Sequence, residues 1–215
     1  MTEYVRPVVE ERIFRDAAGR PVEYGSRWGD GGPPEDTYSV VSNPDRFAPL
    51  HAIAEGLITH LRTTYEVGVR EGAELADDLL HGSTDVDRAV RVTPAEPDAA
   101  PLTFAFTAFP GVIVHAGLLH DFAFPGCGCD ACDETWDTQA EELEELVFSV
   151  VSGGYRESVR RGADLGVEYW LAGPGRRRHG GARPQDFAAG RLVAAEDTLR
   201  RLGGAWHPWP RRLAT

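Results

Sequence analysis

The residues of this chain that are best suited to chemistry are three cysteines within six positions. Cys127, Cys129 and Cys132 form a C-x-C-x-x-C cluster, and the other 212 positions hold no cysteine. Two thiolates at C-x-x-C spacing can bind one ion, and the thiolate two positions earlier can take a third corner of a tetrahedron. The sequence therefore predicts a metal site, with Zn²⁺ as the ion.

A tetrahedral zinc site needs a fourth ligand, and His120 is the nearest upstream candidate. It precedes Cys127 by seven residues, and Pro125-Gly126 between them can turn the chain back. We expect a closed Cys3His site with His120 as the fourth ligand. His115 is less favoured, because alternation along its strand places it in the core. The other candidates for the fourth position are His115, Asp130, Asp133 and Glu134.

Two other classes of function compete with a structural zinc site. An open fourth position would suit a zinc-dependent hydrolase, because a bound water could then be activated. Cys129 and Cys132 alone would suit a thiol oxidoreductase, but the acidic side chains beside them disfavour the thiolate. Since the chain lacks both H-E-x-x-H and a histidine followed by x-Glu, we favour a closed zinc site in a binding or interaction module. Its partner would be an unknown protein or small molecule.

Composition excludes several functions. All 22 basic residues are arginine, so mechanisms that require a catalytic lysine are ruled out. The net charge of −12 argues against a nucleic-acid partner, because phosphate contacts need concentrated positive charge. No apolar run is long enough to span a bilayer, and the N-terminus is too charged for a signal peptide. We therefore expect a cytoplasmic protein without a membrane partner.

The pattern of elements predicts one α+β domain over residues 43–205. An irregular N-terminal arm over 1–42 precedes it, because Gly-Gly and Pro-Pro interrupt both periodicities there, and a docked or mobile tail over 206–215 follows. Helical spacing of apolar residues predicts long helices from Asn43 to Tyr65 and from Trp136 to Tyr155. A short helical piece over 71–80 and a C-terminal helix over 187–202 complete the helices.

Alternating apolar residues predict strands between these helices. The strands are expected near residues 90–92, 103–107, 112–115, 121–124 and 166–172. Most of the links are too short for parallel crossovers, so we expect an antiparallel sheet of about four to five strands packed by the two long helices and the C-terminal helix. The basic stretch from Arg176 to Gly181 is expected to be a solvated loop.

Three phrases carry a resemblance to a known family. They are YSVVSNPDRFAPLHAIAEGLITHL, LTFAFTAFPGVIVHAGLLHDFAFPGCGCDACDETWD and AWHPWPRR, and the match covers most of residues 20–211. In these phrases the chain resembles an uncharacterised actinobacterial family, family 6226 among the domains of unknown function. The resemblance implies a single-domain unit and conveys no activity, substrate or catalytic residue.

Overall fold

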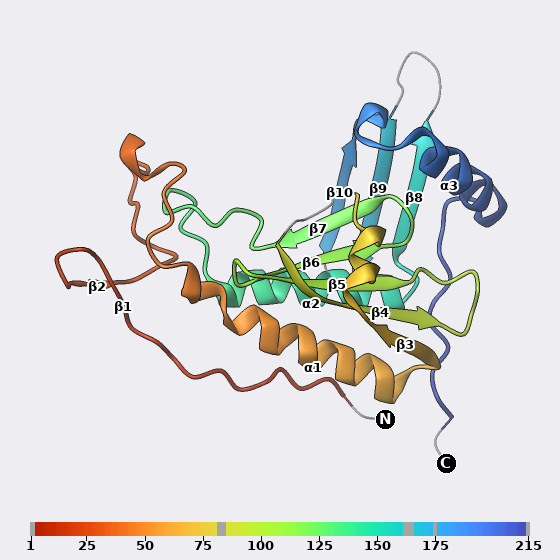
Figure 1. The fold of residues 1–215 in the computed structure, drawn as a ribbon, viewed down its shortest axis with the longest axis horizontal. Coiled ribbons are helices and arrows are strands. Elements are labelled where there is room, and N and C mark those ends of the chain that lie inside the picture. The colour runs from red at the N-terminus through yellow and green to blue at the C-terminus, as the bar shows by residue number, and fades with distance from the viewer. Residues whose placement is uncertain (1–2, 81–84, 161–165, 174–175, 214–215) are drawn as a thin grey trace.

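In its described residues the protein has two main antiparallel sheets, one two-stranded hairpin and three α-helices (Figure 1). The computed structural model describes residues 3–80, 85–160, 166–173 and 176–213. The larger sheet has five strands and the smaller has three, and α1 and α2 lie side by side across one face of the larger sheet. This arrangement confirms the predicted α+β class and the antiparallel pairing.

The strands of the larger sheet follow one another in chain order. The sheet is a meander because short links can join only antiparallel neighbours. Its strands are β3 (Val67–Glu71), β4 (Val86–Pro94), β5 (Leu102–Thr107), β6 (Gly111–Ala116) and β7 (His120–Phe124). The central strand β5 is buried along its whole length, so the sheet is covered on both faces there.

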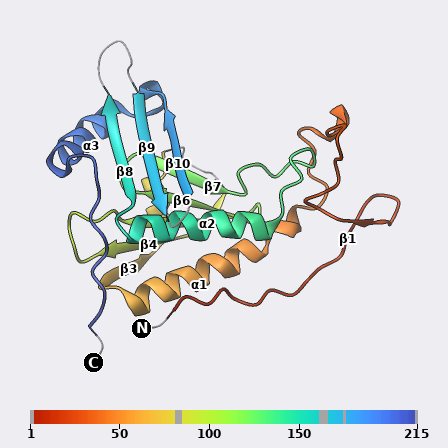
Figure 2. The same ribbon diagram turned by 180° about the vertical axis from the view of Figure 1, so that it is seen from behind.

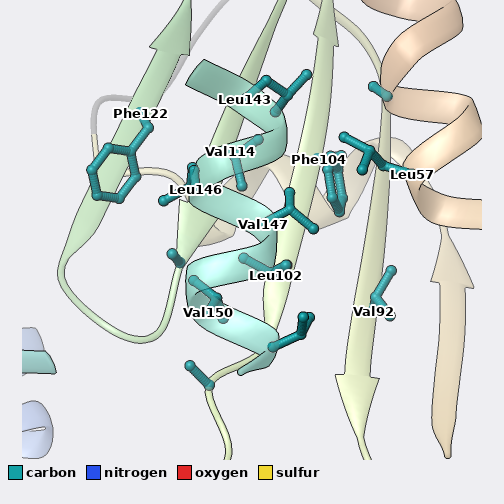
Figure 3. Packing of buried hydrophobic residues seen from close by; sticks show 14 of the residues in the cluster. Leu57, Val92, Leu102, Phe104, Val114, Phe122, Leu143, Leu146, Val147 and Val150 are labelled. Carbon is teal, nitrogen blue, oxygen red and sulfur yellow. The ribbon is translucent and has the colours of Figure 1, made fainter. Parts of the chain in front are cut away.

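Helices α1 (Pro49–Thr64) and α2 (Trp136–Val151) supply the main core. Their apolar faces meet the sheet in a cluster that includes Leu57, Phe104 and Val147 (Figure 3). Each such side chain contributes about 1.5–3 kcal/mol when it is fully buried rather than exposed. Helix α2 begins after Thr135, whose hydroxyl accepts a hydrogen bond from the Thr138 N–H and so caps the first turn.

Two predicted helices differ from the structure. The residues after Asn43 form a short 3₁₀ helix, η2 (Pro44–Phe47), and α1 begins only at Pro49, because a proline has no N–H to donate to the preceding turn. The predicted helical piece over 71–80 is instead the end of β3 followed by the 3₁₀ helix η3 (Ala73–Asp78). Two further 3₁₀ turns are η1 (Glu35–Thr37) and η4 (Pro184–Asp186).

The smaller sheet contains two strands that the sequence did not predict, one at each edge. Its order is β10 (Arg176–Ala182), β9 (Gly166–Gly173) and β8 (Tyr155–Arg160), so the expected loop of arginines is wrong. The residues of β10 pair with β9 from end to end. An edge strand needs only backbone hydrogen bonds, and charged side chains protect it from pairing with other chains. Helix α3 (Ala189–Leu202) follows and packs against β8.

The ends of the described chain dock onto this framework. The arm contains a minimal hairpin of β1 (Phe14–Arg15) and β2 (Pro21–Val22), and its first segment runs beside α1 (Figure 2). A Cβ at Gly56 would lie 2.6 Å from the Pro7 ring, so this glycine allows the close approach. At the other end Trp206 and Trp209 are both buried. The boundaries of the arm, domain and tail stay a prediction.

Candidate metal centre

The cysteines lie in the loop that joins β7 to α2, which we call the cysteine loop (residues 125–135). The sulfur atoms of Cys127, Cys129 and Cys132 all lie within 4.8 Å of one another, and those of Cys127 and Cys129 are 3.3 Å apart. Thiolates bound to one zinc ion at about 2.3 Å in a tetrahedron are separated by roughly 3.8 Å. Small shifts of the side chains would therefore bring all three sulfurs onto one ion.

The three thiols are free and interact through hydrogen bonds. The Cys132 N–H and the Cys127 thiol stabilise the Cys129 thiolate, and they lower the pKa of Cys129 to about 7. Hydrogen bonds with Cys127 and Cys129 raise the pKa of Cys132 to about 12. Three thiolates side by side repel one another, so a cation is needed to ionise the whole group near neutral pH. The group is thus suited to a divalent ion with an affinity for sulfur.

The buried side chain of Arg46 holds the backbone of the cysteine loop. Its guanidinium is 2% exposed and donates to the carbonyl oxygens of Gly128, at 2.9 Å, and Cys129, at 3.3 Å. It also lies 3.5 Å from the Asp130 carboxylate and stacks over the Tyr24 ring at 4.2 Å. A buried cation with these partners fixes the backbone that carries two of the three cysteines.

The N-terminal arm packs against the cysteine loop (Figure 1). Arg27 donates from its backbone and its side chain to the Asp133 carboxylate, and Ser42 donates to Asp130. Backbone bonds add to these contacts, from the Asp130 N–H to the Val40 carbonyl at 2.7 Å and from the Ala131 N–H to the Thr37 carbonyl at 3.2 Å. The arm has little regular structure, yet it orders the loop around the thiols.

The structure does not bring His120 to the three sulfurs. His120 stands at the start of β7, whereas the cysteine loop follows the end of that strand. Its Nδ1 lies 3.0 Å from Oε1 of Glu157, a fully buried residue of β8, and its ring contacts Tyr169 at 4.9 Å. His120 therefore lies at the junction of the two sheets, and its part as a fourth ligand stays a prediction.

The alternative ligands are also engaged elsewhere. Asp130 and Asp133 are held by arginines and the arm, and Glu134 accepts a hydrogen bond from the Cys127 N–H at 3.1 Å. Burial raises the pKa of the Glu134 carboxyl above its usual range. His115 is a core residue, as expected, because its Nδ1 lies 2.7 Å from Asp121 and Arg191 donates to its Nε2 at 3.1 Å. Among the described side chains, the close group at this loop contains the three cysteines alone.

A second group of metal-ligating side chains lies where the tail meets the sheet. Donor atoms of Glu96, Asp98 and His207 lie within 4.8 Å of one another. Arg201 forms an ion pair with Asp98, and Glu96 accepts from the Asp98 N–H at 3.1 Å, so both carboxylates already have donors. This group is separate from the three cysteines, so a variant of one of its residues can serve as a control for zinc binding at the cysteine loop.

Sequence reasoning found the cysteines and missed the residues that hold them. The partners of Arg46 and Arg27 include backbone carbonyls more than 80 positions away, and a carbonyl carries no residue-specific signal. The apolar helix seam beginning at Phe47 could have suggested that Arg46, next to it, is buried.

Fold and site together define a class: an α+β protein with a surface triad of cysteines that could hold a metal ion. The chain belongs to a family of unknown function, DUF6226, whose model matches residues 10–213. No curated protein and no solved structure matches it. None of the helices in the described ranges is long and apolar enough to cross a membrane.

Proposed function

We propose that the cysteine loop binds one Zn²⁺ through Cys127, Cys129 and Cys132, and that this protein is a cytoplasmic binding or interaction module. The observation that carries the proposal is the clustering of three free sulfurs in a loop that the buried Arg46 holds in place. Thiolates favour zinc among the common divalent ions, and free thiols persist in a reducing compartment.

The structural part of the proposal follows from the position of the loop. It links the end of β7, the start of α2 and the N-terminal arm. An ion bound to three of its residues would fix these segments relative to one another, because metal binding energy becomes folding energy when the site forms only in the folded state. The partner of such a module is a protein or small molecule that recognises the ordered surface.

A hydrolase is the second candidate, and one observation favours it. Three protein ligands leave a coordination position for water, and the Glu134 carboxyl lies beside Cys127 with a raised pKa that suits a general base. Against this, a cavity of about 550 Å³ on the smaller sheet is lined by none of these residues, and the same is true of three smaller hollows in the described part of the chain. The interaction module is therefore our conclusion.

Metal content tests the proposal. The untagged, freshly reduced protein is expected to contain about one zinc per chain by elemental analysis. Replacement of any one of the three cysteines by serine should lower the zinc content and the melting temperature, because the ion stabilises the folded state that binds it. His207→Gln is the matched control, since it removes a candidate ligand from the other group and should leave zinc unchanged.

Two results would contradict the proposal. The first is metal-free protein whose three thiols all react freely with a thiol reagent before and after treatment with a chelator. The second is zinc that remains in all three cysteine variants and disappears in His207→Gln, which would place the ion at the second group.

A further inference from the structure

The smaller sheet has a hollowed outer face that shares no residue with the cysteine loop. A cavity of about 550 Å³ lies across all three of its strands. Arg156 on β8, Trp170 on β9 and His179 on β10 are direct neighbours in the register of the sheet, so their side chains point to the same side. Gly203 and Gly204, at the end of α3, complete the lining.

The floor of this hollow is aromatic. Trp170 is 36% exposed, and its ring lies 5.0 Å from the His179 ring with an angle of 30° between the planes. The opposite face of the sheet is occupied, because Tyr155 and Leu171 are buried there. A large aromatic side chain that stays exposed within a concavity offers a stacking surface to a flat ligand.

The arginines around the hollow differ in whether an acidic side chain pairs with them. Arg178 pairs with Glu142 at 3.3 Å, whereas Arg156 and Arg177 form no ion pair with any side chain in the described part of the chain. Among the described acids, Glu168 lies on the same face and pairs with Arg160 at 2.6 Å, and Glu157 lines the hollow but is fully buried. Glu142 and Glu145 line a neighbouring hollow together with Arg177 and Arg178. Two unpaired guanidinium groups beside an aromatic floor are notable in a chain of net charge −12.

We propose that this hollow binds a small planar aromatic anion. The ring of the ligand stacks on Trp170, and its phosphate or carboxylate is held by Arg156 and Arg177, because guanidinium forms paired hydrogen bonds with both groups. The volume lies within the range of small-molecule sites. A free small molecule fits better than a nucleic acid, which would need a longer track of positive charge.

The test uses two probes that present the same chemistry from different sources. Adenosine 5′-monophosphate carries a phosphate and indole-3-acetate carries a carboxylate, and each is titrated into the full-length protein by calorimetry and ligand-observed NMR. At least one of them is expected to bind with a Kd of about 1 mM or tighter. The matching uncharged compound, adenosine or indole-3-acetamide, should bind about tenfold more weakly, since it lacks the group that the arginines hold.

Variants then locate the site. Trp170→Ala and the double variant Arg156→Gln/Arg177→Gln should each weaken binding by about tenfold or more, because they remove the stacking surface and the anion contacts separately. Arg62→Gln is the control, since Arg62 is an exposed arginine of α1 that does not line the hollow. The double variant keeps the test informative if Trp170→Ala fails to fold.

Three outcomes would overturn the proposal. Neither anion binds at millimolar concentration; or binding is unchanged in the double arginine variant; or a single-stranded oligonucleotide binds more tightly than the mononucleotide and loses affinity in the same variants. The last result would identify the face as a nucleic-acid surface instead.

Discussion

His120 Nδ1 lies 3.0 Å from Glu157 Oε1, and this contact joins the two sheets. The Glu157 carboxylate is 0% exposed and accepts three further hydrogen bonds. These come from the N–H groups of Leu118 and Leu119 and from Nε1 of Trp206, at 3.1, 2.8 and 2.9 Å. One buried carboxylate therefore ties the β6–β7 turn, β8 and the C-terminal tail together.

Glu157→Gln is expected to destabilise the protein strongly. The amide nitrogen of glutamine would face donors that now meet a carboxylate oxygen, and breaking a buried charged network costs about 3–5 kcal/mol. Urea denaturation followed by circular dichroism measures the loss. Glu168→Gln is the control, because it removes only a more exposed pair with Arg160 and should cost about 1 kcal/mol or less. Equal losses in the two variants would show that Glu157 does not hold the sheets together.

We expect Tyr155 to lower the free energy of unfolding at alkaline pH. Burial, and then the negative charge of Glu157, raise its pKa well above 10 in the folded protein. The unfolded chain therefore releases the Tyr155 proton at lower pH than the folded chain does. Its contribution is fully present below about pH 10 and is lost above it, at up to about 1.4 kcal/mol per pH unit.

Tyr155→Phe should reduce this slope. The variant also loses the hydrogen bond from the Tyr155 hydroxyl to the Ala116 carbonyl, at 3.2 Å, so it should be less stable at neutral pH. Denaturation curves at several values between about pH 8 and 11 measure both effects. Tyr4→Phe serves as a comparison, because burial also raises the pKa of this more accessible tyrosine of the arm. An unchanged slope in Tyr155→Phe would contradict the assignment.

The sequence predicted the parts of this fold that depend on local spacing. Periodicity identified the helix faces around Leu57 and Val147 and four of the five strands of the larger sheet, since each of these buries apolar side chains. It missed three edge strands, β3, β8 and β10. In β10 three consecutive arginines hide the alternation, and the pairing of an edge strand uses backbone groups.

The candidate site also has a part that the sequence predicted and a part that it could not predict. Cys127, Cys129 and Cys132 are close in sequence, so their spacing alone predicted their proximity. The contacts of His120 with Glu157 and of Arg46 with Gly128 join residues 37 and 82 positions apart. Only the complete fold determines such contacts, so no motif could have revealed them.

Arg46→Gln is expected to weaken zinc binding without removing a ligand. The arginine fixes the carbonyls of Gly128 and Cys129, and loss of a residue that orients metal ligands lowers affinity by about 10- to 100-fold. Competition with a chromophoric chelator measures the change. Arg20→Gln is the control, since Arg20 lies on the arm, pairs with Asp16 and is far more exposed. Identical affinity in Arg46→Gln and the wild type would show that the loop does not depend on Arg46.

His120→Gln separates the two models of the fourth ligand. If the ring stays with Glu157, the variant keeps about one zinc per chain and loses stability, because a contact at the sheet junction is removed. If His120 leaves Glu157 to complete a closed site, the variant loses zinc as the cysteine variants do. From its position at the start of β7, we expect retained zinc together with a lower free energy of unfolding, measured by elemental analysis and urea denaturation on the same sample. Zinc loss equal to that of Cys129→Ser would establish the closed Cys3His site and require a rearrangement of the loop and the strand.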